Sequence, residues 1–217
     1  FKQLRLRNWG PLPVDPQTIN AVILTHAHID HSGYLPLLAK NGFKGKIYCT
    51  RATRDLCEIL LPDSGHLQEE EAEYANRQGF SKHKPALPLY TKEDAGRCLK
   101  LFSPLDFDAE WVLDEALKVR FIPSGHILGS AFVSIRSPET SILFSGDIGR
   151  PNDIVMPAPK TIEAADYLVV ESTYGDRRHD PADPRLKLAE IINHTAKRGG
   201  VVIIPAFAVG RAQTLLY

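Results

Sequence analysis

The chain has 217 residues, and its 26 acidic residues balance its 26 lysines and arginines. This length allows one large domain, or one domain and part of another, without a disulfide framework. Because the net charge is zero, any contact with RNA or DNA must come from local groups. The three cysteines form no CxxC pair, and no apolar run reaches the ~18 residues of a membrane span. We therefore expect a cytoplasmic protein with reduced thiols and no membrane contact.

Short apolar strands alternate with helices in the first half of the chain. AVILT at 21–25 is a continuous apolar run, which predicts a strand buried on both faces, and GKIYCT at 45–50 predicts a second strand. Helical patterns follow, and Gly42 is expected to end the first of them. The predicted helical segments are 32–42, 52–61, 66–79 and 92–102.

Consecutive strands are expected later in the chain, where β-branched residues become frequent and alternate in part with polar ones. An amphipathic helix at 182–200, an apolar strand at 201–207 and a helix that starts at Gly210 follow them. The whole pattern predicts a mixed α/β fold in which helices cover the sheets. The consecutive strands are predicted at 117–123, 130–137, 141–147 and 165–173.

The motif HAHIDH holds three of the eight histidines of the chain and one aspartate. His26 and His28 follow a strand two residues apart, so extended geometry points both side chains the same way. Asp30 and His31 come where the chain turns into a helix. Zinc accepts imidazole and carboxylate ligands, and two metals about 3.5–4 Å apart are used to hydrolyse phosphate esters. The usual alternative for a histidine is an ordinary surface or core residue with no metal. Here that explanation would have to apply to three histidines within one motif.

Two further strand ends support a metal site. His126 lies between glycines after a predicted strand, in PSGHILGSA, and Asp147 lies in the same setting in LFSGDIG. Glycine permits the close backbone approach that a crowded site needs, and an aspartate has two oxygens with which to bridge two metals. SGD alone is a common turn sequence. These two segments therefore indicate a metal site only in combination with the histidine motif before them.

Through THAHIDH at 25–31, His126 and Asp147, the sequence resembles the metallo-β-lactamase superfamily. The resemblance spans most of the chain and implies an αββα sandwich that binds two zinc ions. The residues implied to bind the first zinc are His26, His28 and His126. Those implied to bind the second are Asp30, His31 and Asp147, together with a later histidine that has no match before Tyr217.

The segments after Asp147 resemble the β-CASP branch of that superfamily, which acts on nucleic acids. The likeness rests on LVVESTYGDRRH at 168–179 and GGVVIIPAFAVGRAQTLLY at 199–217, and it points to the RNA-cleaving group that contains the mRNA 3′-end processing endonuclease. Glu171 matches the acidic residue of the first extra motif of that branch, although a solvated strand-end carboxylate is the plain alternative. Arg211 opens a helix and is expected to contact phosphate, unless it is an ordinary helix-start charge. Ser172 is expected to donate a hydrogen bond to phosphate.

The resemblance also implies a domain organisation. Residues 1–180 are expected to form a metallo-β-lactamase domain without its first strands, and 181–217 the beginning of a truncated β-CASP domain. An aspartate that precedes the histidine motif in the family is missing, as are the later β-CASP histidine motifs. The chain as given is therefore expected to bind metal but to turn over poorly.

The expected activity is that of a zinc-dependent ribonuclease, in which a hydroxide shared by two zinc ions attacks the phosphorus atom of RNA. Asp30 is expected to orient the hydroxide, and Glu171 to support the acid that protonates the departing oxygen. A thioester or lactone hydrolase of the same fold is the alternative, and a non-catalytic scaffold is a third. The scaffold is disfavoured because six ligands are kept. The expected partners are RNA and, as an open alternative, a second copy of the chain in a homodimer.

Overall fold

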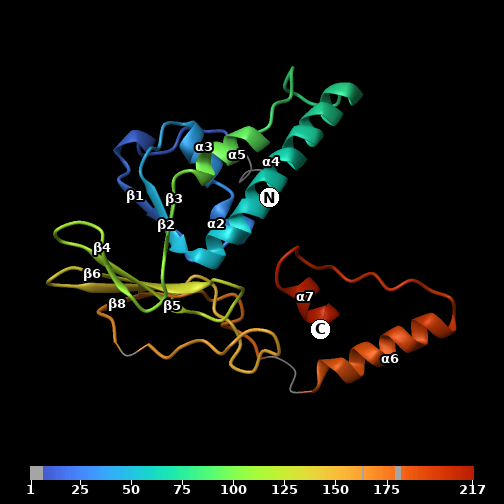
Figure 1. The fold of residues 1–217 in the computed structure, drawn as a ribbon. Coiled ribbons are helices and arrows are strands. Elements are labelled where there is room, and N and C mark those ends of the chain that lie inside the picture. The colour runs from blue at the N-terminus through green and yellow to red at the C-terminus, as the bar shows by residue number, and fades with distance from the viewer. Residues whose placement is uncertain (1–6, 163, 179–181) are drawn as a thin grey trace. The chain divides into compact units, whose positions relative to one another are not determined.

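The computed structural model describes residues 7–162, 164–178 and 182–217, and Figure 1 shows their fold. The chain divides into two compact units, Phe1–Val170 and Glu171–Tyr217. The domain boundary expected at residue 180 stays a prediction, because a compact unit marks where contacts are dense and not where a fold domain ends.

Two sheets form the first unit. The first is parallel, in the order β1 (Ala21–Ile23), β2 (Lys46–Thr50) and β3 (Phe102–Leu105). The second has the order β4-β5-β6-β7-β8 and is antiparallel except for the parallel pair β7 and β8. Its strands are β4 (Glu110–Val112), β5 (Lys118–Pro123), β6 (Ala131–Arg136), β7 (Ser141–Phe144) and β8 (Tyr167–Val169).

The main apolar core lies between the two sheets. Leu105 of β3 belongs to the same buried cluster as Val119 and Phe121 of β5, and Ile23 and Tyr48 of the first sheet pack against this cluster. Helices cover the other side of the first sheet (Figure 1), with α4 in contact with both β2 and β3. The mixed α/β class predicted from the sequence is confirmed, and the packed sheets with a helical layer are consistent with a metallo-β-lactamase sandwich. The described helices of this unit are η1 (Pro16–Thr18), α2 (Ile29–Ser32), α3 (Leu35–Lys40), α4 (Arg51–Gln78) and α5 (Lys92–Leu99).

The two helices predicted within 52–79 are one helix, so that expectation was wrong. α4 has 28 residues and continues through Pro62, although proline removes one backbone donor there. The buried side chains of Cys57 and Leu61 and the buried Gly65 recur every four residues, so one apolar face continues across the proline. α4 ends at Gly79, which has a φ of 68° and the left-handed conformation of a C-terminal glycine.

Two strand predictions also need correction, and two strands were missed. β1 is half-buried and not buried on both faces, because it lies at the edge of its sheet. The strands β3 and β4 were missed, since they are short and have no clear alternation. The apolar stretch 201–207 forms no strand, and its Val201 and Ile203 are 84% and 86% exposed. A strand needs a neighbouring strand to pair with, and the described part of the second unit provides none. The second unit contains α6 (Pro184–Lys197) and α7 (Arg211–Leu216).

A glycine pair tests the packing between α4 and the loop that carries His126. Gly129 has a φ of +81°, and a Cβ atom there would lie 2.4 Å from the backbone nitrogen of Thr53. We expect Gly129→Ala to lower the free energy of unfolding by roughly 2–4 kcal/mol, from the left-handed backbone and the overlap together. Gly96, in α5, has nothing within 4 Å of an added Cβ, so Gly96→Ala should raise stability by about 0.5–1 kcal/mol. Urea unfolding would measure both, and equal effects of the two changes would contradict this packing.

Candidate metal centre

The histidine motif lies where the two sheets are joined. Beyond the last residue of β1, Leu24 still donates its N–H to Tyr48 O, at 2.8 Å, and the next carbonyl, that of Thr25, accepts the N–H of Ala131 at the start of β6, at 3.0 Å. The first sheet and the second are thus hydrogen-bonded at the residue before His26. The motif then turns into α2, and Ser32 closes this turn by donating its hydroxyl to Ala27 O at 2.8 Å.

His126 lies in the loop between β5 and β6, and two groups of hydroxyls hold this loop. Ser130 Oγ accepts the N–H groups of His126 and Ile127, at 2.9 and 3.1 Å. From the start of α4, Thr50 and Thr53 both donate to Gly129 O, at 2.7 and 3.0 Å. The position of His126 is therefore fixed by buried hydrogen bonds within the loop and to the helical layer.

Asp147 follows β7 in a second loop, which is tied to the first. Ser124 donates its hydroxyl to Asp147 O at 3.1 Å, and Ser124 O accepts the N–H of Gly149 at 2.8 Å. Gly146 has a φ of +51°, and a Cβ atom there would lie 2.8 Å from both Cβ and Oγ1 of Thr25. A glycine is needed at this position because any side chain would push the Asp147 loop away from the histidine motif.

Four of the predicted ligands converge on one small volume. His28 Nδ1 and His126 Nε2 are 3.1 Å apart, and Asp147 Oδ2 lies 3.3 Å from His126 Nε2 and 3.7 Å from His26 Nε2. One ligand atom from each of these four residues lies within 4.8 Å of all the others. Such a separation lets one ion contact several of them, since zinc binds nitrogen and oxygen at about 2.0–2.2 Å.

The other two predicted ligands adjoin this group through Asp147. His31 Nε2 is 3.3 Å from Asp147 Oδ1 and 3.6 Å from Asp30 Oδ2. The two oxygens of Asp147 therefore face different histidines, with Oδ2 toward His26 and His126 and Oδ1 toward His31. The structure thus brings all six predicted side chains together, and their roles as ligands stay a prediction. We call these six residues, His26, His28, Asp30, His31, His126 and Asp147, the His–Asp cluster.

His26 is the buried member of the cluster, with an exposed fraction of 0%. Burial, which disfavours the cation, and the neighbouring His31, His28 and His126 together lower its pKa from 6.5 to about 2. The imidazole is therefore neutral near pH 7, which is the form that binds metal. Within the described residues, His26 Nε2 is a buried nitrogen without a hydrogen-bond partner. A buried lone pair that faces three histidines and a carboxylate fits a metal ion.

Thr25 fixes which nitrogen of His26 carries the proton. Thr25 Oγ1 lies 3.1 Å from His26 Nδ1. If Nε2 carried the proton, a buried donor would be left unsatisfied, because Asp147 Oδ2 at 3.7 Å is beyond hydrogen-bonding distance. The favourable arrangement places the proton on Nδ1, donated to Thr25, and leaves the Nε2 lone pair toward the cluster. Sequence reasoning missed this role, although the position of a hydroxyl directly before the first histidine was a usable signal.

The remaining predicted site residues, Glu171, Ser172 and Arg211, belong to the second unit. Glu171 is half-buried, and its Oε2 accepts the hydroxyl of Thr173 at 2.6 Å. Ser172 is exposed, and its carbonyl accepts the N–H of Gly175 at 3.2 Å. Arg211 is exposed at the start of α7 and donates to Pro205 O at 3.3 Å. Their predicted roles in catalysis and phosphate binding stay predictions.

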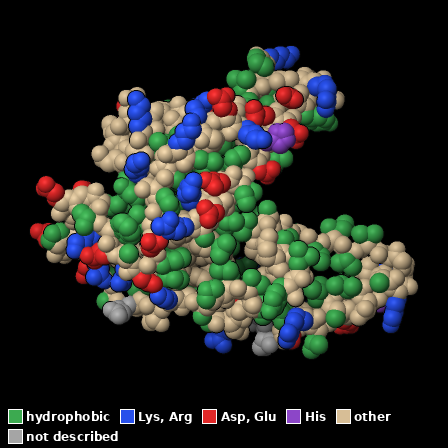
Figure 2. All heavy atoms as spheres, viewed as in Figure 1, with side chains coloured by type: hydrophobic (Ala, Val, Ile, Leu, Met, Phe, Trp, Pro, Cys, Tyr) green, Lys and Arg blue, Asp and Glu red, His purple; other side chains and the backbone are tan. Residues whose placement is uncertain are grey.

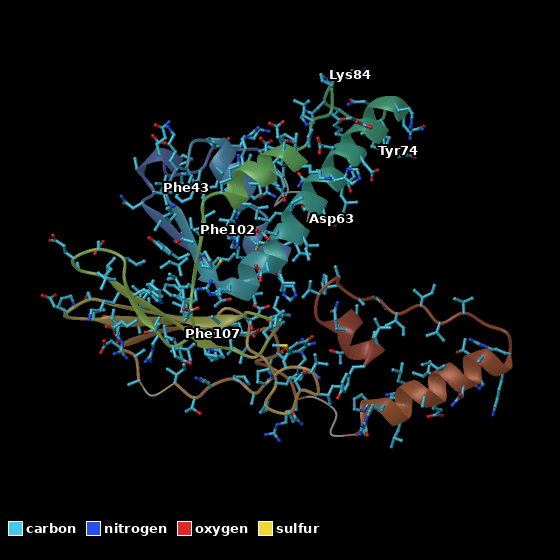
Figure 3. The ribbon with its side chains drawn as sticks, viewed as in Figure 1. Phe43, Asp63, Tyr74, Lys84, Phe102 and Phe107 are labelled. Atoms are coloured by element: carbon cyan, nitrogen blue, oxygen red, sulfur yellow. The ribbon has the colours of Figure 1, made fainter. Side chains whose placement is uncertain are left out.

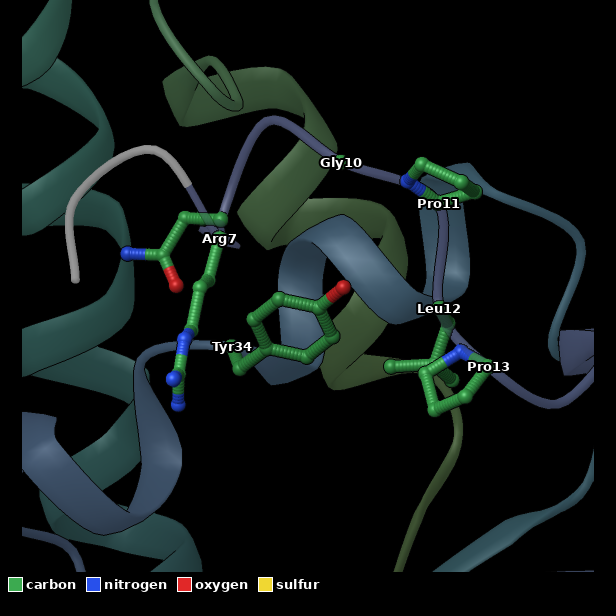
Figure 4. A pocket seen from close by; sticks show the side chains of 7 residues that line it. Arg7, Gly10, Pro11, Leu12, Pro13 and Tyr34 are labelled. Atoms are coloured by element: carbon green, nitrogen blue, oxygen red, sulfur yellow. The ribbon is translucent and has the colours of Figure 1, made fainter. Parts of the chain in front are cut away.

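A surface pocket near the start of the described chain shares no lining residue with the cluster, and Figure 4 shows its side chains. It contains no carboxylate and no imidazole, so its chemistry gives no reason to place a metal there. Its lining residues are Arg7, Asn8, Gly10, Pro11, Leu12, Pro13 and Tyr34.

None of the helices among the described residues has both the length and the apolar character required to cross a bilayer.

Comparison with known proteins agrees with this architecture. The family model described as the metallo-beta-lactamase superfamily matches residues 10–186. The chain is 39% identical over 212 residues to ribonuclease TTHA0252 of Thermus thermophilus, covering 97% of this chain and 45% of that protein. It is 34% identical over 206 residues to the transcription termination factor FttA of Methanocaldococcus jannaschii, covering 92% of this chain and 30% of that factor.

A fungal protein matches as well. The chain is 34% identical over 208 residues to endoribonuclease ysh-1 of Neurospora crassa, covering 93% of this chain and 23% of that enzyme. The chain therefore spans less than half the length of each of these relatives. Their names confirm the resemblance to the RNA nucleases of the β-CASP branch. With the family match over residues 10–186, they lead to one conclusion: the chain belongs to the metallo-beta-lactamase superfamily.

Proposed function

We propose that the whole protein hydrolyses RNA as a zinc-dependent phosphodiesterase and that the His–Asp cluster holds two zinc ions. The observation that carries this proposal is the convergence of ligand atoms from His26, His28, His126 and Asp147 within 4.8 Å of one another. Three imidazoles with one carboxylate form a donor set that zinc accepts, and the position of His31 and Asp30 beside Asp147 supports a second metal.

The arrangement of Asp147 supports the division of the cluster into two ligand sets. Its Oδ2 faces His26 and His126, whereas its Oδ1 faces His31. The first ion would be held by His26, His28 and His126, and the second by Asp30, His31 and Asp147.

The chemistry follows from the residues around the ions. When bound, zinc supplies an acidified water and stabilises the charge that develops on the phosphate. The Asp30 side chain is 79% exposed, so its carboxylate can face substrate and solvent while it lies beside His31. Asp30 thereby orients the attacking water. Thr25 keeps His26 in the tautomer that leaves Nε2 available.

Glu171 and the nearby exposed groups are proposed to act on the leaving group and the backbone of the substrate. Glu171 lies two residues after the end of β8. Glu171 supports the acid that protonates the departing oxygen, and Ser172 and Arg211 donate to phosphate oxygens. RNA as the substrate is supported by the names ribonuclease and endoribonuclease of two relatives.

The first test removes cluster members one at a time. Asp30→Ala and His126→Ala should each reduce cleavage of single-stranded RNA by the whole protein to below about a tenth of the parent rate, since removal of a catalytic metal ligand costs several kcal/mol of transition-state stabilisation. His66→Ala, which removes an exposed histidine of α4, serves as the control and should cleave normally. Cleavage rates would be measured with a labelled RNA oligonucleotide, and the hydrolysis of simple lactones and thioesters would be measured for comparison. Preference for a lactone over RNA would reject the substrate class.

The second test addresses Glu171. We expect Glu171→Gln to lower the rate of RNA cleavage by about 100-fold, because an amide cannot support a catalytic acid whose contribution is typically 10²–10⁴-fold. Zinc content, measured by atomic emission, should not change. Glu190→Gln in α6 makes the same chemical change at an exposed position of the same unit and should be neutral. Full ribonuclease activity in Glu171→Gln would remove Glu171 from the mechanism.

The third test separates the hydroxyl of Thr25 from its shape. Thr25→Val keeps the shape but loses the hydrogen bond to His26, so zinc affinity should fall by about 10–100-fold, whereas Thr25→Ser should bind nearly as tightly as the parent. Competition with a chelator measures affinity, and nitrogen NMR of the metal-free protein reports which ring nitrogen of His26 is protonated. A parent protein with its proton on Nε2 would contradict the assigned role.

A further inference from the structure

The far end of α4 presents aromatic and basic side chains together. Tyr74 and Phe80 are 49% and 66% exposed, and their ring centroids are 5.9 Å apart in an edge-to-face arrangement. The guanidinium carbon of Arg77 lies 5.5 Å from the centroid of the Tyr74 ring. Lys82 and Lys84 follow in the adjoining loop and are exposed. Figure 3 shows Tyr74 and Lys84 at this end of the helix. We call Tyr74, Arg77, Phe80, Lys82 and Lys84 the aromatic–basic tip.

The loop of the tip is held in place by hydrogen bonds to α4. The side chain of Asn76 donates to Ala86 O at 2.9 Å and accepts the N–H of Ala86 at 2.7 Å. Gln68 Oε1 accepts the N–H of Leu89 at 3.2 Å, and the buried Tyr90 ends the loop with its hydroxyl 2.8 Å from Ser64 Oγ. The exposed rings therefore lie next to a loop that is held to α4 by hydrogen bonds.

The charge of the tip differs from that of the rest of α4. Residues 74–91 contain Arg77, Lys82 and Lys84 and neither aspartate nor glutamate. Four glutamates lie just before them on the helix, and two of these are engaged: Glu69 accepts the N–H of Lys92, and Glu70 pairs with His66. Figure 2 shows basic side chains at the end of the helix and acidic side chains beside them. The tip is thus locally cationic in a chain of zero net charge.

A ligand that is complementary to the aromatic–basic tip needs flat apolar faces and regularly spaced negative charges. Single-stranded RNA has both, because its bases stack on aromatic rings and its phosphates pair with arginine and lysine. A protein partner that relied on apolar burial would not need three cations around two rings. We propose that the aromatic–basic tip binds a single-stranded stretch of RNA away from the His–Asp cluster. Bases stack on Tyr74 and Phe80, and the cations contact the phosphates.

The length of α4 sets the size of RNA that can use the tip. Thr53, at the start of α4, contacts Gly129 in the loop of His126. Tyr74 lies roughly 32 Å further along the helix, at 1.5 Å for each of about 21 residues. Stacked nucleotides rise about 3.4 Å each, so about nine are needed to reach from the cluster to the tip. The binding role rests on the proposed function for its substrate, but it is testable without cleavage.

The experiment measures binding by fluorescence anisotropy in the whole protein, with RNAs of about four and about 20 nucleotides. The double change Tyr74→Ala and Phe80→Ala should weaken binding of the longer RNA by about 10-fold or more, given base–aromatic stacking. Binding of the shorter RNA at the cluster should not change. Ile59→Ala, which removes an exposed apolar side chain of the same helix outside the tip, is the control and should bind both RNAs as the parent does.

A second variant tests the phosphates. Lys82→Gln with Lys84→Gln should reduce the salt dependence of binding of the longer RNA by about 1.4 in the slope of log affinity against log salt, from about 0.7 for each lost contact. Unchanged binding of the longer RNA by the aromatic variant would overturn the proposal, as would equal losses with both RNA lengths. If the parent binds the longer RNA through the tip but cleaves no RNA, the proposed function fails while the tip assignment stands.

Discussion

The fixed convergence of the His–Asp cluster is the constraint on which the rest of the first unit depends. Four imidazoles and two carboxylates lie close together, and His26 is so deeply buried that its pKa falls to about 2. The buried Nε2 lone pair of His26 costs free energy when nothing binds it, and a ligand in the cluster would compensate for that cost. The surrounding hydrogen bonds and glycines can be understood as means of keeping these side chains together.

Each supporting contact acts on a different part of the cluster. The bond from Ala131 to Thr25 joins the two sheets beside His26, and the bonds of Ser124 link the loops of His126 and Asp147. Gly146 lets the Asp147 loop pack against Thr25 without a side chain between them. Because these contacts come from β1, β6, β7 and their loops, the geometry of the cluster requires the packed sheets. The positions of the cluster side chains therefore depend on the packing of the two sheets.

The sequence predicted the cluster well because each member follows a recognisable strand, and strand ends gather at one edge of a sandwich. His126 and Asp147 could be proposed as partners of the histidine motif although about 100 residues separate them from it, since glycines surround both. The hydroxyls of Thr50 and Thr53 were not predictable in this role, because their acceptor, Gly129 O, lies on a distant loop. Tertiary packing also keeps α4 continuous through Pro62, although the local sequence predicted two separate helices there. The absence of strand structure at 201–207 shows the reverse case, in which an apolar run lacks a partner among the described residues.

The central claim is that the His–Asp cluster is a two-metal site. It is tested most directly by a crystal structure of zinc-loaded protein, with anomalous scattering measured on both sides of the zinc absorption edge. The account predicts two anomalous peaks about 3.5–4 Å apart, both within ligand distance of Asp147, with one beside His26 and the other beside His31. A correctly folded, zinc-saturated protein whose zinc lies elsewhere, or whose cluster holds no ion, would contradict it.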